Sequence, residues 1–457
     1  MAKKKEKTLE EKLQEALVPE NQWPYMLPEN WCWTRLENVA NWGSGGTPSR
    51  KHPEYYQGNI PWIKTGELKD DFIYDAEEHI SEEAISKSNA KLFPVNTVVL
   101  AMYGATIGKA GIMGCELATN QACACGVSNE SINYRFLFEY IKSQKDGFIA
   151  SGKGGAQPNI SQQIIKSYPI PLPPLPEQKR IVHRIESLFA KLDEAKEKIQ
   201  QVLDGAEMRK AAILHKAFTG ELTKNWRKEN GISEDSWGEY TLQSVCTMKI
   251  TDGTHKTPTY SDKENGVVFL SAKDITSGEI NWENTKYITS ELHTELYSRL
   301  APQINDILLA KNGTTGVAAL VKEDKVFDIY VTLALLRPNV EIVIPEYLLN
   351  IINSPICKVQ FNENLTGIGV PNLHLRDIKD VKIKVPSIGE QKIISDKVEM
   401  LLANEGMVTK NCLKQIEVID TMKKSILAKA FRGELGTNNP TEDSALNLLK
   451  EVLQDKS

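Results

Sequence analysis

Apolar residues recur every three or four positions along one long stretch of the chain. Two interleaved series with seven-residue spacing make up this stretch: Ile181, Leu188, Ala195, Val202 and Arg209, with Ile185, Leu192, Ile199, Ala206 and Ile213. Such a repeat is typical of a coiled coil. It predicts a helix of about 40 residues, or about 60 Å. Since globular helices average about 11–12 residues, an ordinary surface helix is the weaker interpretation.

The same pattern returns 213 positions later. Its series are Ile394, Leu401, Val408, Gln415 and Met422, with Val398, Glu405, Cys412, Ile419 and Ile426, where Gln415 and Glu405 are polar breaks. The start 177–179 matches 390–392, and Ala217-Phe218 matches Ala430-Phe431, both at this offset. Because no residue is gained or lost between these anchors, each copy has a fixed length. We expect the two helices to pair antiparallel.

Residue types at the ends of these stretches agree with helix boundaries. Prolines at 173, 174 and 176 precede the first helix, and proline suits a helix start. Gly220 and Gly433 stand near the two ends, where glycine commonly stops a helix. Gly205 lies inside the first helix and marks a candidate kink.

The segments that precede each helix also repeat, with offsets of 207 to 213. Residues 95–101 match 304–310, and Gly46-Thr47 matches Gly253-Thr254. Apolar runs bounded by turn residues predict strands at 97–102 and 306–310, and helical spacing predicts helices at 131–143 and 345–353. We expect an α+β fold: two tandem α/β domains separated by two long antiparallel coiled-coil helices, with a pseudo-twofold internal repeat.

The expected domain boundaries follow from the repeat. They are an N-terminal extension at 1–27, a first domain at 28–173, a central helix at 174–222, a second domain at 223–386, a C-terminal helix at 387–435 and a tail at 436–457. Short amphipathic helices are expected near Leu9, Leu13 and Leu17, and near Leu449 in the tail. Two interpretations stay open for these ends: docking on partners, or frayed termini.

Composition narrows the class of protein. The chain is 41% hydrophobic and 25% charged, as ordinary soluble proteins are. No apolar run reaches the ~18–20 residues that cross a bilayer, and no signal-peptide core follows Met1, so no membrane role is expected. Seven cysteines, an odd number, favour reduced thiols in the cytoplasm. The net charge of −5 counts against a free-standing nucleic-acid binder.

Motifs for catalysis or for metal binding are missing. The run 104–110 resembles a phosphate-binding loop but is one residue short and has Ala110 where Ser or Thr should bind magnesium. Cys115, Cys123 and Cys125 lack the further ligand that a structural zinc site needs. We therefore expect no catalytic residue, no metal and no cofactor on this chain.

Polar, glycine-bearing loops stand at matched places in both domains. Their side chains are of the types that reach base edges and phosphates, although ordinary turns remain an alternative. The candidate DNA contacts are Gly46, Thr47, Ser49, Arg50, Lys51, Lys64, Thr65, Tyr103, Thr106, Lys109, Lys153, Gln157 and Asn159 in the first domain, and Thr254, His255, Lys256, Lys273, Lys311, Asn312, Thr314, Asn372 and His374 in the second.

Taken in order, these features resemble the specificity (S) subunit of type I restriction–modification enzymes, over nearly the whole chain. The motifs that carry the resemblance are 174–181, 217–222, 390–394 and 430–435, with 45–49, 59–66 and 158–161. The second copy departs at Ser387-Ile388-Gly389, where the first has Pro174-Leu175-Pro176.

The resemblance implies a non-catalytic subunit with two target-recognition domains that bind double-stranded DNA. It implies assembly with two modification subunits, which carry S-adenosylmethionine and methylate adenine. It also implies two restriction subunits, which use ATP and Mg. Each domain would read half of a split target, and the helices would set the gap. Two hypotheses compete: a coiled-coil adaptor joining two protein partners without reading DNA, and a self-contained methyltransferase or nuclease.

Overall fold

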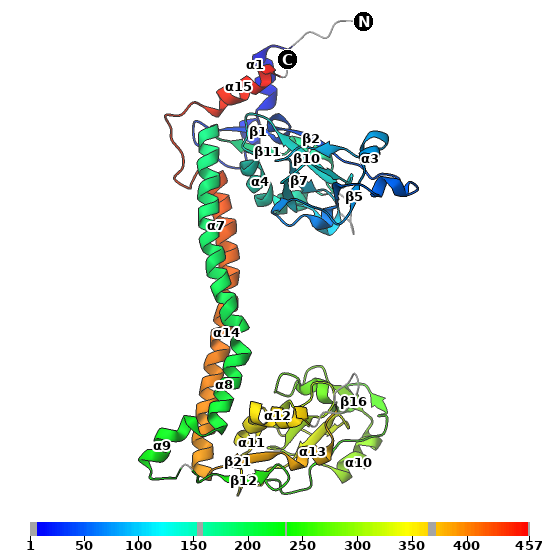
Figure 1. Cartoon of the computed structure of the whole chain (residues 1–457), viewed down its shortest axis with the longest axis vertical. Helices are drawn as coiled ribbons and strands as arrows, with labels where there is room; N and C mark the ends of the chain where they lie inside the picture. Colours follow the sequence, from blue (N-terminus) through cyan, green and yellow to red (C-terminus); the bar gives the residue numbers. More distant parts are fainter. Residues whose placement is uncertain (1–6, 153–158, 234, 364–371, 456–457) are drawn as a thin grey trace. The chain divides into compact units, whose positions relative to one another are not determined.

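The computed structural model describes residues 7–152, 159–233, 235–363 and 372–455. It divides into two compact units, which we call unit 1 (Met1–Lys198 with Gln415–Ser457) and unit 2 (Ile199–Lys414). Each unit holds one mixed α/β domain together with a stretch of the long helices (Figure 1). The expected α+β class is therefore confirmed. Among the described residues, no helix is both long and apolar enough to cross a membrane.

The described part of unit 1 contains a five-stranded sheet with the order β2-β10-β7-β8-β4 and a four-stranded sheet with the order β5-β3-β9-β6. A third, two-stranded sheet pairs β1 with β11. The strands are β1 Cys32–Arg35, β2 Ala40–Ser44, β3 Ile60–Ile63, β4 Phe72–Ile73, β5 His79–Ile80, β6 Leu92–Phe93, β7 Val98–Ala101, β8 Ala110–Met113, β9 Leu117–Thr119, β10 Cys123–Ser128 and β11 Pro169–Leu172. The domain helices are α2 Leu36–Val39, α3 Glu82–Lys87, α4 Tyr134–Ser143, α5 Lys145–Ser151 and α6 Gln162–Ser167.

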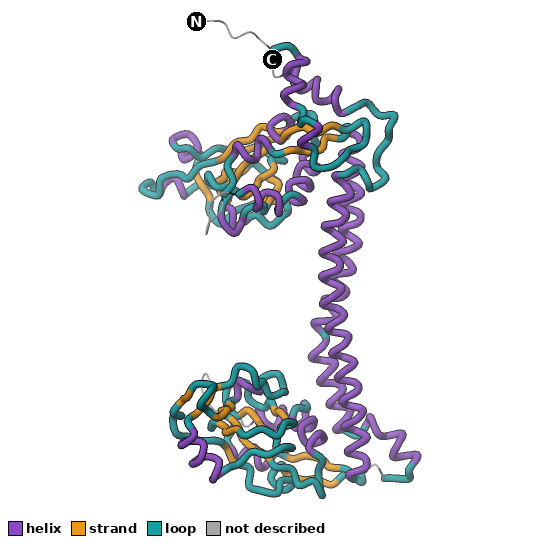
Figure 2. The backbone as a smooth tube through the Cα atoms, turned by 180° about the vertical axis from the view of Figure 1, so that it is seen from behind, coloured by secondary structure: helices purple, strands orange, loops and turns teal. Residues whose placement is uncertain are grey.

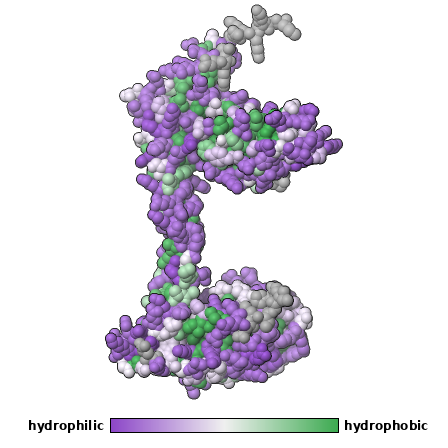
Figure 3. Space-filling view, viewed as in Figure 1, coloured by the Kyte–Doolittle hydropathy of each residue, from purple (hydrophilic) through white to green (hydrophobic). Residues whose placement is uncertain are grey.

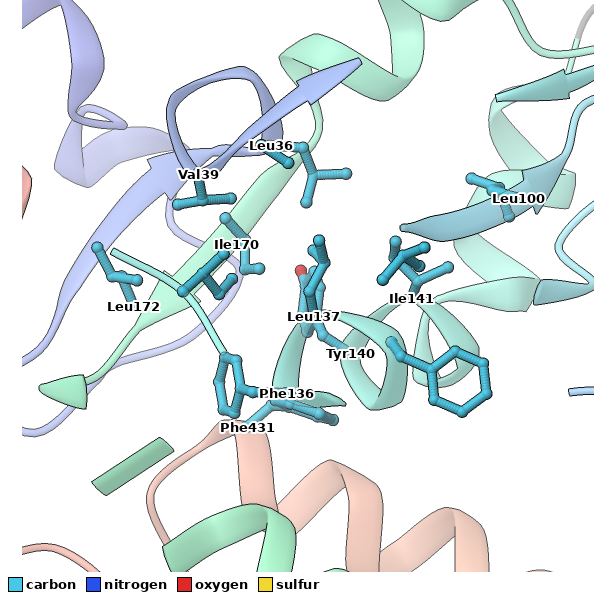
Figure 4. Packing of buried hydrophobic residues seen from close by; sticks show 14 of the residues in the cluster. Leu36, Val39, Leu100, Phe136, Leu137, Tyr140, Ile141, Ile170, Leu172 and Phe431 are labelled. Atoms are coloured by element: carbon cyan, nitrogen blue, oxygen red, sulfur yellow. The ribbon is translucent and has the colours of Figure 1, made fainter. Parts of the chain in front are cut away.

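Strand β7 is buried on both faces, because successive side chains of a strand point to opposite sides. Val98 and Leu100 pack in the core that contains α4, and Figure 4 shows Leu100 with Leu137 and Ile141 of that helix. Val99 and Ala101 enter a second core on the other face. The continuous apolar run therefore forms the central layer of the domain.

The described part of unit 2 contains two four-stranded sheets, with orders β13-β20-β17-β18 and β14-β16-β15-β19, and the pair β12-β21. The strands are β12 Gly238–Thr241, β13 Thr251–Asp252, β14 Tyr260–Ser261, β15 Val267–Leu270, β16 Lys286–Ile288, β17 Ile307–Ala310, β18 Ala318–Leu320, β19 Phe327–Ile329, β20 Leu333–Leu336 and β21 Lys382–Val385. The helices of this domain are α9 Lys224–Glu229, α10 Ser290–Arg299, α11 Pro345–Ile352, α12 Pro355–Glu363 and α13 Leu375–Asp380. As in β7, alternate residues of β17 enter two different cores.

The long helices are α7 Leu175–Asp204, α8 Ala206–Phe218 and the 44-residue α14 Ile388–Phe431 (Figure 2). The break between α7 and α8 falls at Gly205, the candidate kink. Gly220 (φ 82°) and Gly433 (φ 74°) follow the ends of α8 and α14 in the left-handed conformation that favours glycine.

Within unit 1, α7 and α14 run antiparallel. Lys196 Nζ lies 2.9 Å from Asp420 Oδ1, and Asp193 pairs with Lys423, so one helix ascends in number as the other descends. Within unit 2, Arg209 and Glu405 form a salt bridge of 2.6 Å. Both belong to the predicted seam, so the polar break of one helix meets a cation from the other.

Some predicted seam positions are not in the interface. Val202, Val408 and Met422 are 39%, 41% and 45% exposed. A helix with 3.6 residues per turn drifts by about 20° per heptad away from a strict seven-residue repeat. The repeat in the sequence therefore overstates how many of its positions are buried.

One glutamine at the start of each long helix pins that helix to its domain. Gln178 Nε2 donates to Ser131 O and Pro173 O, both at 2.9 Å, and Gln178 Oε1 accepts from Asn133 N at 2.7 Å. In unit 2, Gln391 makes the matching bonds, to Ile342 O and Pro386 O at 2.9 Å and from Ile344 N at 2.9 Å. The repeated Glu-Gln-Lys motif is thus a structural pin in both units.

The glutamate before each glutamine is buried against the segment that follows the other long helix. Glu177 accepts from Trp31 Nε1 (2.8 Å) and Asn438 Nδ2 (2.9 Å). Burial raises the pKa of Glu177.

The glutamate of unit 2 has a charged partner. Glu390 accepts from Trp237 Nε1 (3.2 Å), Thr223 Oγ1 (2.7 Å) and Arg227 Nη1 (2.6 Å). Arg227 and Glu390 are 5% and 1% exposed, so their ion pair is buried. The two junctions therefore share a carboxylate and a tryptophan but differ in charge.

The two ends of the chain pack on each other in unit 1. Helix α1 (Leu9–Ala16) begins with a capping box between Thr8 and Glu11. Ala16 and Leu449 of α15 (Ala445–Asp455) belong to the same buried core. Over the described residues, the apolar faces of both terminal helices are covered by this packing. The packing therefore favours neither docking of these helices on partners nor frayed termini.

Candidate nucleic-acid interface

The predicted loops of unit 1 gather around the turn that follows β9. Gly46 N donates to Thr119 O at 3.0 Å, and Thr47 Oγ1 donates to Gln121 Oε1 at 2.6 Å. The loops after β7 and before α6 meet through a bridge between Tyr103 and Asn159. Segments that are far apart in the sequence thus form one polar surface.

Unit 2 repeats this arrangement around the turn after β19. Thr254 N donates to Ile329 O at 3.2 Å, and Thr254 also forms a bridge with Tyr330. Asn312 and Asn372 form a bridge that matches the one between Tyr103 and Asn159. Tyr103, Asn159, Asn312 and Asn372 were all predicted as site residues, so the structure brings these four together in two matched pairs.

Close backbone packing explains glycine at the entrance of each cluster. A Cβ placed on Gly45 would lie 1.9 Å from Thr119 O, and one on Gly253 would lie 1.9 Å from Ile329 O. Neither carbonyl can move without disturbing its strand. Glycine is therefore required at both places by the approach of two backbone segments.

A charged network covers one side of the unit 1 cluster. Glu78 accepts from Lys64 Nζ at 2.8 Å and from Arg50 Nη2 at 2.6 Å. The hydrogen bond from Lys64, with a further bond from Arg50, lowers the pKa of Glu78. The Arg50 guanidinium also lies 4.0 Å from the centre of the Tyr56 ring.

The other predicted residues of unit 1 differ in exposure. Thr47, Ser49, Lys51, Tyr103 and Asn159 are exposed, Thr65, Thr106 and Lys109 are half-buried, and Gly46 is buried. Lys153 and Gln157 lie outside the described residues. Most of the predicted side chains in unit 1 are therefore available to a ligand.

Unit 2 departs from the prediction at two residues. Thr254 and Lys311 are both 6% exposed, and Lys311 pairs with the buried Asp252. This placement corrects the expectation that Lys311 is free to reach a ligand. The backbone bonds of Lys311 match those of Met102 in unit 1, so the buried ion pair replaces an apolar packing position.

The remaining predicted residues of unit 2 reach the surface. His255, Lys256, Lys273, Thr314 and His374 are exposed, and Asn312 and Asn372 are half-buried. Lys256 forms a salt bridge of 2.6 Å with Glu295, and both of these side chains are largely exposed. These residues stay candidates for contact.

The structure adds a hollow in unit 2 that sequence reasoning missed. A separate cavity of about 430 Å³ lies in unit 1, beside Lys145 and Lys424. The hollow in unit 2 lies next to the loop cluster and has a volume of about 310 Å³. Its walls include Tyr260, Phe269 and Tyr330, with Lys273 and Lys286. Its aromatic residues stand in three separate segments, so no local motif announces it.

The structure also points to two residues of unit 1 that the predicted set omitted. Asn120 and Gln121 form the turn around which the loops gather, and Gln121 is exposed. The available signal was a polar turn directly after the short apolar strand 117–119.

The surface offers polar contacts rather than reactive groups. Burial raises the pKa of the Cys32, Cys125 and Cys357 thiols to about 12, so all three stay protonated at neutral pH. Among the described residues, no group of three or more His, Cys, Asp or Glu side chains is placed to hold a metal ion. Hydrogen-bond donors and aromatic faces are what this surface presents.

Known proteins resemble the chain along most of its length. It is 24% identical to the EcoKI specificity subunit of Escherichia coli (strain K12), over 94% of this chain and 96% of that one. It is 26% identical to the EcoBI specificity subunit of Escherichia coli, over 75% and 76%. The fold is similar to the HsdS subunit of Thermoanaerobacter tengcongensis, with a TM-score of 0.60, 18% identity and coverage of 91% and 100%.

A family model supplies the assignment. The model described as "Type I restriction modification DNA specificity domain" matches residues 28–204 and 234–418. These two matches cover most of the chain, and each includes one α/β domain and the start of the long helix that follows it. The chain belongs to the family of type I restriction–modification DNA specificity domains.

Proposed function

We propose that this chain is the sequence-specific DNA-binding subunit of a type I restriction–modification enzyme. Each α/β domain reads one half of a split target. The observation that carries the proposal is the duplicated loop cluster, held by matched backbone bonds but bearing different side chains in the two units. Different side chains on one frame are expected to read different bases.

The long helices set the unread gap between the halves. Support comes from the constant offset of 213 between the two copies, since loops tolerate insertions and these segments contain none. Removing four residues from each helix shortens it by about 6 Å, under two base pairs at ~3.4 Å per pair. We expect the spacer of the recognised motif to shorten while both halves stay the same. A spacer of unchanged length would contradict the proposal that the helices set its length.

The chain itself is non-catalytic and works in the cytoplasm with two modification subunits and two restriction subunits. S-adenosylmethionine would bind the modification subunits, and ATP and Mg would bind the restriction subunits. Equilibrium dialysis of the purified chain with labelled S-adenosylmethionine tests this division, and we expect no binding. Saturable binding would favour a self-contained methyltransferase.

Exposed apolar side chains support a docking surface for the modification subunits on the paired helices. Figure 3 shows hydrophobic colour on the surface of these helices. In unit 2, the exposed apolar residues of this stretch are Val202, Met208, Met400, Met407, Val408 and Leu413. Methionine is common at adaptable binding surfaces, so the exposed methionines of these helices fit a protein partner.

Sequencing of methylated adenines in cells that carry the system is the decisive experiment. Wild type should produce one split motif. Asn159→Ala, in unit 1, and Lys273→Ala, in unit 2, should each relax one half only, because both side chains are exposed on separate loop clusters. An equal change in both halves would contradict the proposal that each domain reads its own half of the target.

A coiled-coil adaptor that joins two protein partners without reading DNA is the alternative, and the family assignment does not favour it. A gel shift of the chain with its modification subunit separates the two. Tighter binding to a duplex with the target than to a random duplex supports the reader. Equal binding would support the adaptor.

A further inference from the structure

Arg50 is held in a fixed orientation although most of its side chain is exposed. Its side chain is 59% exposed, yet Nη2 donates to Glu78 Oε2 at 2.6 Å. The guanidinium carbon Cζ lies 4.0 Å from the centre of the Tyr56 ring and 5.8 Å from the centre of the Trp62 ring. A free surface arginine would sample many rotamers, so these contacts orient it before any ligand arrives.

The groups that hold Arg50 are themselves anchored. Tyr56 donates its hydroxyl to Pro48 O at 2.6 Å, and Trp62 Nε1 donates to Gly46 O at 3.0 Å. Glu78 is fixed from its other oxygen by Lys64 at 2.8 Å. Two aromatic rings and a carboxylate thus position one guanidinium beside the Gly46–Thr47 loop.

Part of the donor edge of Arg50 remains open. Nε and Nη1 of Arg50 donate to none of the residues that the structure describes. Bidentate recognition uses a neighbouring pair of N–H groups, either Nε with Nη2 or Nη1 with Nη2. Nη2 carries two N–H groups and Glu78 accepts from one of them, so one such pair stays open. By contrast, the Lys64 amine is already bound to Glu78, and its side chain is 34% exposed.

Unit 2 has no equivalent of Arg50. Gly45 and Gly253 occupy matching places, 208 positions apart, and at that offset Pro258 stands where unit 1 has Arg50. In the next strand the offset is 207, so Phe269 replaces Trp62 and Ser271 replaces Lys64. The neighbourhood is the open hollow lined by Tyr260, Phe269 and Tyr330. The arginine is therefore a feature of one reading surface and no part of the shared frame.

We propose that Arg50 reads a guanine in the target half recognised by unit 1. Guanine offers O6 and N7 as neighbouring acceptors in the major groove, and a bidentate arginine is the commonest specific contact to it. Glu78 and Tyr56 act as positioning residues. The inference rests on the proposed DNA-reading function and specifies one base of the target.

The test uses the full chain in complex with its modification subunit. Wild type first defines the split motif, and Lys273→Ala identifies the half that belongs to unit 2. Duplexes with each base at each guanine of the other half are then compared for methylation rate and affinity, with wild type and with Arg50→Ala and Arg50→Lys.

Both Arg50 variants should lose about 5- to 150-fold discrimination at one guanine and keep every other position. Arg50→Lys keeps the charge but loses the fork, so its salt dependence should match wild type. Glu78→Gln should weaken the same position less, because Gln keeps an acceptor for the arginine. Lys87→Ala is the matched control, since Lys87 is another exposed unit 1 cation paired with a glutamate (Glu83, 2.7 Å) and lies outside the predicted contacts, so its motif should be unchanged.

Three results would overturn the inference. The first is a unit 1 half that contains no guanine. The second is full discrimination by Arg50→Lys. The third is an equal loss of affinity for all duplexes with Arg50→Ala, which would mark a phosphate contact. Failure of the proposed function is distinguishable, because wild type would then produce no split motif at all.

Discussion

Unit 1 and unit 2 match at the base of each domain and differ at the loop surface. At the base, Gln178 and Gln391 each donate to two backbone carbonyls and accept from one backbone amide. At the loop surface, unit 1 presents Arg50 beside Glu78 and Lys64, whereas unit 2 presents an aromatic hollow. Equivalent positions at the base of the two domains thus make the same hydrogen bonds, whereas equivalent positions at the loop surface have unrelated side chains.

Solvent accounts for this division. A buried polar atom must find a partner, so the glutamine and the two carbonyls it serves cannot change one at a time. Exposed side chains can exchange their partners for water, and they are free to diverge. Where buried residues do differ, as with Met102 and Lys311, the charged residue has a buried partner of opposite charge, Asp252.

Loss of the buried Arg227–Glu390 ion pair should produce the largest difference in stability between the units. Arg227→Ala leaves the Glu390 carboxylate buried without its cation, and we expect a loss of about 3–5 kcal/mol in unit 2. Hydrogen exchange of peptides from 223–241, read by mass spectrometry, measures this.

Arg180→Ala is the control in unit 1. Arg180 pairs with Glu442 at 2.7 Å, but its side chain is 40% exposed, so the loss should not exceed about 1 kcal/mol. Equal losses in the two units would refute the idea that burial separates these pairs.

The Lys311–Asp252 pair should respond to double substitution. Lys311→Met introduces the residue that unit 1 has at Met102 but leaves the buried Asp252 carboxylate without its cation. We expect this to destabilise unit 2 by about 3 kcal/mol. Adding Asp252→Ala should recover most of that loss, because an apolar pair can replace a buried ion pair. Urea unfolding followed by local hydrogen exchange measures the cycle. If the double variant were less stable than Lys311→Met, the two positions would not act as a pair.

The two glutamine pins should be equivalent. Gln178→Ala and Gln391→Ala each remove three hydrogen bonds to backbone groups, and we expect each to cost about 1–3 kcal/mol in its own unit. The same exchange measurement on residues 131–133 and 342–344 reports the two effects. A loss of stability in only one of the two variants would contradict the equivalence of the two glutamines.

The smallest effect concerns pH. Burial raises the folded-state pKa of Glu177 above its unfolded value of about 4.3. Folding then favours the protonated carboxyl, so unit 1 loses stability as pH rises from about 4.3 through the raised value, and loses no more above it. Glu177→Gln should remove this part of the pH dependence. Unfolding curves of wild type and variant between pH 4 and 8 that stay parallel would contradict the assignment.

Much of the fold could be predicted from local patterns. The 3,4 repeat and its fixed offset predicted helices that the structure places at Leu175–Asp204, Ala206–Phe218 and Ile388–Phe431. The buried runs predicted β7 and β17, because an uninterrupted apolar segment must be covered on both faces. The matched glycine loops identified the segments that meet in each cluster.

Tertiary structure decided which side chains of those loops are available. The sequence predicts Lys311 and Lys64, together with Arg50, as candidate DNA contacts. Only the fold brings Asp252 to Lys311, 59 positions away, and Glu78 to Lys64, 14 positions away. It also decided that the terminal helices cover each other and that three seam residues face solvent. Periodicity records the direction in which a residue points along one element, whereas charge pairing and burial depend on what a distant segment places beside it.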